Sequence, residues 1–173
     1  MTKRLTSERV WEEIDKELFA VIGMVTPHNE SRTAGVVYIV RNGRLYISSN
    51  KNAWKVKHIA QNPHVSLTIP VHKSIPFMPW FKIPAATITF SGTAQILEPE
   101  ETPTEIVRAI FRDMAENKTL MAESCLIEVT PVKDFITYGI GIPLMQMRDP
   151  KLARNRVPVF SESEHPDEIE KIR

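Results

Sequence analysis

A lysine at the start of a short helix is the residue whose type and position point most directly to chemistry. Lys55 falls at the beginning of a helical pattern over residues 54–61, and Ser48 and Ser49 precede it at the end of a β-rich run. A positive charge at a helix N-terminus opposes the helix dipole by about 0.3–1 kcal/mol. A bound phosphate would reverse that conflict, because the first N–H groups of a helix bind anions. Lys55 could therefore hold a phosphate, with Ser48 or Ser49 adding a hydroxyl. From the residues alone, the favoured alternative for Lys55 is a solvated surface lysine, and ordinary turn serines are an equal alternative for Ser48 and Ser49.

Small side chains and one tryptophan surround this position in the sequence. Thr33, Ala34, Gly35 and Val36 open a β-rich run, and small residues there let the backbone approach a flat ring. The alternative, favoured for Val36, is packing inside the sheet. Trp54 either stacks on a ring, covers a subunit boundary, or simply packs, which is the commoner role of a lone aromatic residue.

Several other chemistries are excluded by motif and spacing. The five histidines (28, 58, 64, 72 and 165) lack metal-ligand spacing such as HExxH, so we expect no metal site. The GxSxG, Walker and GxGxxG patterns are absent. Cys125 is the only cysteine, which rules out an internal disulfide and favours a core role in its apolar strand.

The composition is that of an ordinary globular domain in a reducing compartment. Among 173 residues, 22 basic and 21 acidic side chains leave a net charge of +1, so no general affinity for nucleic acid or anionic membranes is expected. The charged N-terminus does not resemble a signal peptide. No stretch approaches the roughly 20 apolar residues that a membrane span needs. We predict a cytoplasmic location.

Apolar periodicity predicts mostly strands. Asn42 and Gly43 lie between two β-rich runs, a strong hairpin signal because both residues tolerate positive φ. Asn62 and Pro63 end the helical pattern that begins at Trp54. Helices are expected over residues 7–18, over 54–61 and from 102, and strands over 19–26, 33–40, 44–49, 64–69, 85–97, 125–130 and 135–138.

These elements predict a mainly β protein with peripheral helices, built as one antiparallel barrel of six or seven strands. Closing the sheet removes exposed strand edges. We expect a domain over residues 1–160 and a polar C-terminal tail over 161–173. The apolar, proline-rich block 75–84 is either a dimer surface or a cap over a pocket, because contiguous apolar patches mark contact sites. The segment 139–148 receives no assignment from its sequence.

The order of these elements resembles the pyridoxamine 5'-phosphate oxidase-like family of FMN-binding split barrels. The likeness covers roughly residues 10–140. It is carried by residues 33–38 (TAGVVY), 43–49 (GRLYISS), 54–55 (WK), 59–67 (IAQNPHVSL) and 91–94 (SGTA). The fold that the resemblance implies is an antiparallel split barrel of the flavin-binding type.

The resemblance also implies a site. In that family a basic residue at the start of the short helix grips the FMN phosphate, a position that falls on Lys55. The preceding strand end corresponds to Ser48 and Ser49, and the flavin ring lies against the strand that holds residues 33–37. The partner subunit completes the pocket, so a homodimer is implied. Thr33 and Trp54 stand where true pyridoxamine phosphate oxidases have arginines, and their C-terminal segment is not recognisable here, so vitamin B6 oxidation is not expected.

The function that follows is an FMN-dependent oxidoreductase, similar to a flavin reductase, acting on an unidentified small molecule. Hydride would pass from a nicotinamide donor such as NAD(P)H to flavin N5, with the cofactor supplying the chemistry. Two alternatives stay open. One is a reductase that uses a deazaflavin in the same groove, and the other is a flavin- or haem-binding protein without turnover.

Overall fold

The computed structural model describes residues 5–72 and 85–160. The predicted cap or dimer block 75–84 and the predicted tail 161–173 lie outside the described residues. The strands are β1 (Phe19–Val25), β2 (Ser31–Val37), β3 (Ile39–Arg41), β4 (Arg44–Asn50), β5 (His64–Val71), β6 (Ala86–Leu97), β7 (Ser124–Tyr138) and β8 (Arg154–Pro158). The helices are α1 (Ser7–Lys16), α2 (Trp54–Gln61), α3 (Thr104–Phe111), α4 (Lys118–Glu123) and α5 (Pro150–Ala153), with 3₁₀ turns η1 (Pro99–Glu101), η2 (Arg112–Glu116) and η3 (Leu144–Arg148).

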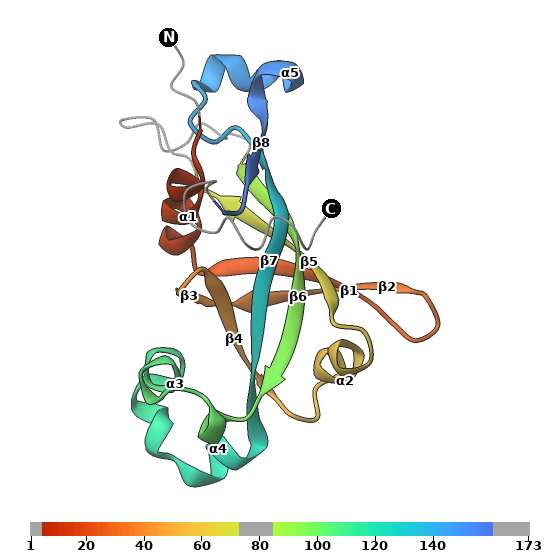
Figure 1. Cartoon of the computed structure of the whole chain (residues 1–173), viewed down its shortest axis with the longest axis vertical. Coiled ribbons are helices and arrows are strands. Elements are labelled where there is room, and N and C mark those ends of the chain that lie inside the picture. The colour runs from red at the N-terminus through yellow and green to blue at the C-terminus, as the bar shows by residue number, and fades with distance from the viewer. Residues whose placement is uncertain (1–4, 73–84, 161–173) are drawn as a thin grey trace, which may run out of the picture.

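The strands form one curled antiparallel sheet, which confirms the predicted split barrel. Their order is β2-β1-β5-β6-β7-β4-β3, and every pairing is antiparallel. The short strand β8 lies off this path and pairs with β7. In Figure 1, β6 and β7 run side by side, with α3 and α4 at one end and α5 and β8 at the other. Curling of the sheet brings β2 close to β4, which is the arrangement that positions the predicted site.

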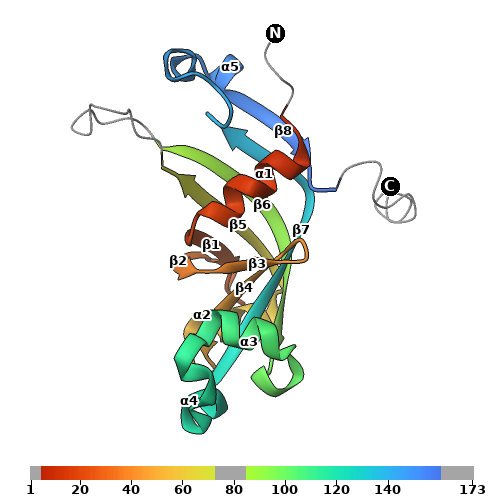
Figure 2. The same ribbon diagram turned by 90° about the vertical axis from the view of Figure 1, so that its left-hand side faces the viewer.

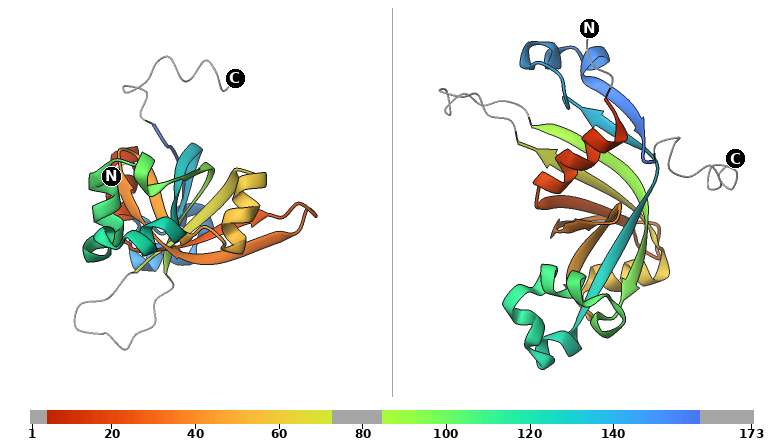
Figure 3. Two further views of the ribbon diagram at one scale, coloured as in Figure 1. Left: turned by 90° about the horizontal axis from the view of Figure 1, so that it is seen from below. Right: turned by 60° about the vertical axis from the view of Figure 1, so that its left-hand side comes forward.

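The strand β7 is longer than the sequence predicts. Two strands were expected around Pro131, but β7 runs unbroken for 15 residues, and Figure 3 shows it spanning the molecule. Pro131 lies opposite Gly92, beside a register shift in β6 between Thr89 and Ser91. A bulge already interrupts the ladder there, so a residue without an N–H group is tolerated.

The hairpin prediction is confirmed, whereas the predicted strand 33–40 is interrupted. Asn42 and Gly43 have φ of 52° and 68°, as a tight turn between β3 and β4 requires. Tyr38 separates β2 from β3, and its hydroxyl donates to the Ile14 carbonyl at 2.7 Å. This buried hydrogen bond ties the bend in the strand to helix α1.

Two apolar clusters lie on opposite faces of β4 and β7. The larger cluster fills the barrel, and α1 adds Val10 and Ile14 to it while contacting β3 and β5 (Figure 2). The smaller cluster lies between the sheet and the helices α3 and α4; its buried members are Tyr46, Ile106, Val107, Phe111, Met121 and Leu126. Helices therefore contribute to both clusters: α1 and α2 to the larger one, and α3 and α4 to the smaller one.

The segment 139–148, unassigned from sequence, is part of the core. Gly139 and Gly141 turn the chain with φ of 73° and 67°. Ile140 and Met147 are then buried in the large cluster. Across the described ranges, no helix combines the length and apolar character that crossing a membrane requires.

Candidate functional site

The start of α2 is open to an anion. Its N-cap residue, Ala53, makes no side-chain hydrogen bond, and the first turn contains no acidic residue. Helix α1 shows the contrast, because Thr6 caps it and Glu8 lies in its first turn. The first N–H groups of α2 are thus uncapped by side chains, and they carry the positive end of the helix dipole.

Lys55 lies half-buried in this first turn, and α2 contacts the strands β6 and β1. Ser49 of β4 lies opposite Cys125 of β7. Burial raises the pKa of the Cys125 thiol and Glu98 raises it further, while the charges of Lys51 and Lys55 oppose the shift. The charge of Lys55 thus acts on the thiol that lies opposite Ser49 in the sheet.

The two predicted serines point to opposite faces of β4. Ser49 is buried, with its hydroxyl 3.4 Å from the Asn50 carbonyl oxygen. Ser48 is exposed and lies opposite Leu126, which belongs to the cluster under α3. Because side chains alternate along a strand, Ser49 faces the barrel side, as Cys125 does, and Ser48 faces the outer side.

Two neighbours of Lys55 have other contacts. The ammonium of Lys51 forms an ion pair with Glu98 at 2.5 Å, and this hydrogen bond raises the pKa of Lys51. Its charge is thus partly neutralised. Trp54 is 47% exposed and meets His58 edge-on at a ring-centroid distance of 5.7 Å, so its face is available beside the start of α2.

The predicted residues on β2 also divide between two faces. Val36 is buried in the barrel core and Ala34 packs against it, so packing is the role that the structure gives Val36. Thr33 and Gly35 lie on the outer face. A Cβ atom at Gly35 would lie only 2.8 Å from Cε2 of Phe19. The ring of Phe19 therefore already occupies the space that the missing side chain of Gly35 leaves open.

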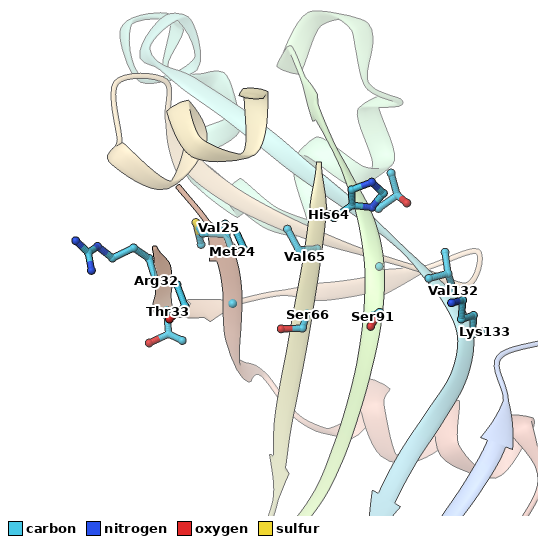
Figure 4. A pocket seen from close by; sticks show the side chains of 14 residues that line it. Met24, Val25, Arg32, Thr33, His64, Val65, Ser66, Ser91, Val132 and Lys133 are labelled. Carbon is cyan, nitrogen blue, oxygen red and sulfur yellow. The ribbon is translucent and has the colours of Figure 1, made fainter. Parts of the chain in front are cut away.

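A trough on the outer face of the sheet was missed by sequence reasoning. It has a volume of about 620 Å³, and its lining comes from β1, β2, β5, β6 and β7. Figure 4 shows the side chains that line it. One row of paired residues crosses the strands β2, β1, β5 and β6; its members, in that order, are Thr33, Gly23, Ser66 and Ser91. The full lining is Gly23, Met24, Val25, Ser31, Arg32, Thr33, His64, Val65, Ser66, Ser91, Gly92, Thr93, Val132 and Lys133. Only Thr33 belongs to the predicted site. The alternation of small or hydroxyl residues with apolar ones in β5 and β6 was the available signal.

The charged side chains that line a second pocket are mainly acidic, whereas those that line the trough are basic. It measures about 840 Å³ and lies between α1 and the β3–β4 hairpin. Glu8, Glu12 and Asp15 line it, with Arg41 as the basic member of the lining. Three carboxylates disfavour a phosphate-bearing ligand, so this pocket does not compete for the predicted cofactor. Within residues 5–72 and 85–160, no three His, Cys, Asp or Glu side chains gather as a metal site would need.

Comparison with solved structures identifies the same fold in proteins that bind redox cofactors. A haem-binding protein of Mycobacterium smegmatis has a TM-score of 0.65 and 13% identity, covering 92% of this chain and 60% of that one. HutZ, the haem storage protein of Vibrio cholerae, has a TM-score of 0.60 and 12% identity, with coverages of 79% and 98%. An FAD-binding protein of Mesorhizobium loti has a TM-score of 0.55 and 11% identity, with coverages of 73% and 88%. Identities this low establish the fold alone.

Comparison at the level of sequence identifies the family. No curated protein matches the chain. The family model described as pyridoxamine 5'-phosphate oxidase matches residues 6–134, a span that runs from α1 into β7 and includes β2, β4 and α2. The chain therefore belongs to the pyridoxamine 5'-phosphate oxidase family.

Proposed function

We propose that the protein is an FMN-dependent oxidoreductase that holds the cofactor phosphate at the start of α2. The observation that carries this proposal is the uncapped first turn of α2, with Lys55 half-buried in it and free of acidic neighbours in that turn. A phosphate dianion is stabilised by such N–H groups and by a nearby ammonium. Ser49 supplies a hydroxyl on the same side of β4.

The strand β2 supplies the place for the ring. It is the terminal strand in the sheet order, so the N–H and C=O groups of one edge have no neighbouring strand among the described residues. These groups would hydrogen-bond the polar edge of a flat heterocycle, and the curl of the sheet brings β2 close to β4. Bound FMN would supply hydride transfer, while the chain binds it, orients it and limits access of water.

Replacing Lys55 with alanine should weaken FMN binding about 10- to 100-fold, the cost of losing one charge-assisted hydrogen bond. Quenching of flavin fluorescence during titration measures the dissociation constant. Lys57→Ala is the matched control, because Lys57 is exposed on the same helix and should change affinity less than about threefold. Equal affinities in wild type and Lys55→Ala would remove Lys55 from the site.

The absorbance spectrum of the purified protein separates the candidate cofactors. A flavin spectrum supports the proposal, and reduction of that flavin by NADH or NADPH distinguishes an enzyme from a carrier. A deazaflavin band would show that the cofactor in this groove is a deazaflavin, which has a longer tail, and not FMN. A Soret band would assign haem, as the names of two structural neighbours suggest, and would overturn the flavin proposal.

We also propose a homodimer that forms through the outer face of β1 and β2. Phe19 and Val37 lie opposite each other there, 44% and 66% exposed, next to Leu18 at 62%. Val37→Glu should shift the mass in light scattering from about twice 19.8 kDa toward the monomer, because it would place a charge in an apolar contact. Leu152→Glu, on the exposed face of α5, should leave the mass unchanged. A monomeric wild type would refute the dimer.

A further inference from the structure

One end of the trough gathers the groups that bind an oxyanion. Ser66 lies opposite Ser91, and His64 lies opposite Thr93, on the paired strands β5 and β6. Lys133 of β7 follows Val132, the residue opposite Ser91. Three hydroxyl donors, one imidazole and one ammonium group thus lie on the neighbouring strands β5, β6 and β7. Adjacent strands in a sheet are about 4.8 Å apart. None of the described residues that line the trough is acidic.

The backbone of Lys133 is held in an uncommon conformation. Its φ is 64°, in the left-handed region that non-glycine residues adopt at a cost. The neighbouring contacts fix it there, because its carbonyl accepts from Val159 N–H at 3.0 Å and Asp134 pairs with Arg156 at 3.3 Å. Lys133 is exposed and has no ion-pair partner among the described residues. A glycine would fit this position without strain, so the backbone alone does not account for a lysine here.

The other end of the trough is different. Arg32 extends away from Ser66 at the open edge of β2 in Figure 4, and its guanidinium pairs with Glu30 at 2.7 Å. Between the two ends, the Ser66 hydroxyl lies over Gly23, and Val25 is exposed on the same face of β1. Val25 gives this part of the trough an apolar surface, which suits a ring better than a sugar.

We propose that the trough binds a flat organic acid, with the oxyanion held by Lys133 and the hydroxyls of Ser66, Ser91 and Thr93. The ring would lie on the outer face of β1, against Val25. A carboxylate and a phosphate share this chemistry. The proposal rests on the proposed function only in making that acid the substrate; Lys55 is not among the residues that line the trough, and binding there needs no cofactor.

A pair of fluorescent probes tests the charge requirement. The sulfonate 8-anilinonaphthalene-1-sulfonate and its neutral parent N-phenyl-1-naphthylamine share the same rings and differ in the anionic group. Lys133→Gly removes the ammonium and suits the left-handed backbone. It should weaken sulfonate binding about 5- to 20-fold while changing binding of the neutral probe less than about twofold. Lys133→Arg should restore sulfonate binding, and Lys118→Gly, on α4, should have no effect on either probe.

Competition and the flavin variants complete the test. Benzoate and phenyl phosphate are titrated against the bound sulfonate, and the stronger competitor identifies the acid as carboxylate or phosphate. Failure of both to compete, an unchanged sulfonate affinity in Lys133→Gly, or equal losses for both probes would overturn the proposal. Lys55→Ala should leave the sulfonate response intact, and Lys133→Gly should leave FMN affinity intact. The trough and the flavin site can therefore fail separately.

Discussion

Replacing Phe135 with alanine should lower the free energy of unfolding by about 3–5 kcal/mol, the range found when buried phenylalanines are truncated. The ring is fully buried and meets Trp11 and Phe90 edge-on, with centroid distances of 5.2 and 5.5 Å. These three rings join α1, β6 and β7. Urea unfolding followed by tryptophan fluorescence measures the loss, with the midpoint and the slope fitted separately.

Two further variants show whether that loss comes from the ring contacts. Phe135→Leu keeps most of the volume but removes the edge-to-face geometry, so it should cost less than the alanine variant. Leu152→Ala, at a half-exposed position on α5, should change stability by less than about 1 kcal/mol. A loss below about 1 kcal/mol in Phe135→Ala would mean that α1 does not depend on this packing.

The parts of the fold that sequence reasoning predicted correctly depend on local signals. Helix α2 begins and ends where its apolar spacing and Asn62–Pro63 indicate. The turn at Asn42 and Gly43 follows from the φ angles those residues tolerate. The alternation in β5 buries Val65, Leu67 and Ile69 on one face. Each signal lies within about ten residues of chain, so no knowledge of distant partners was needed.

The missed features depend on partners far away in sequence. Pro131 reads as a strand end until its position opposite Gly92 is known. The short polar strand β8 (Arg154–Pro158) has no apolar alternation of its own and is a strand because it pairs with β7. Sequence alone could place neither, because both need a register between residues tens of positions apart.

The same distinction applies to the two sites. Lys55 at the start of a helix is a local pattern, so the sequence could indicate it. The trough takes two or three residues from each of five strands, and Ser66, Ser91 and Lys133 become neighbours only through the sheet order. Its polar side chains read individually as ordinary exposed positions on strands.

Gly92 is where the fold and the trough depend on the same residue. Its backbone lines the trough, while a Cβ there would lie 2.8 Å from Cγ1 of Val129 and 3.0 Å from the carbonyl oxygen of Thr130. The second contact is with backbone, which cannot turn aside as a side chain can. Gly92→Ala must therefore push β6 away from β7 at the bulge. We expect a loss of about 1–3 kcal/mol in the free energy of unfolding, together with weaker sulfonate binding, because Ser91 moves with the strand.

Gly23→Ala is the matched control, since Gly23 also lines the trough and is equally crowded. Its Cβ would lie 2.7 Å from the Oγ atom of Ser66, but that hydroxyl can rotate to another rotamer. The expected cost is therefore below about 1 kcal/mol. In the double variant Gly92→Ala/Val129→Ala the side-chain clash is removed and the contact with the Thr130 carbonyl remains. If the backbone contact dominates, the double variant should still be less stable than Val129→Ala alone. If the two are equally stable, the constraint comes from the Val129 methyl group, and the bulge would then tolerate a side chain.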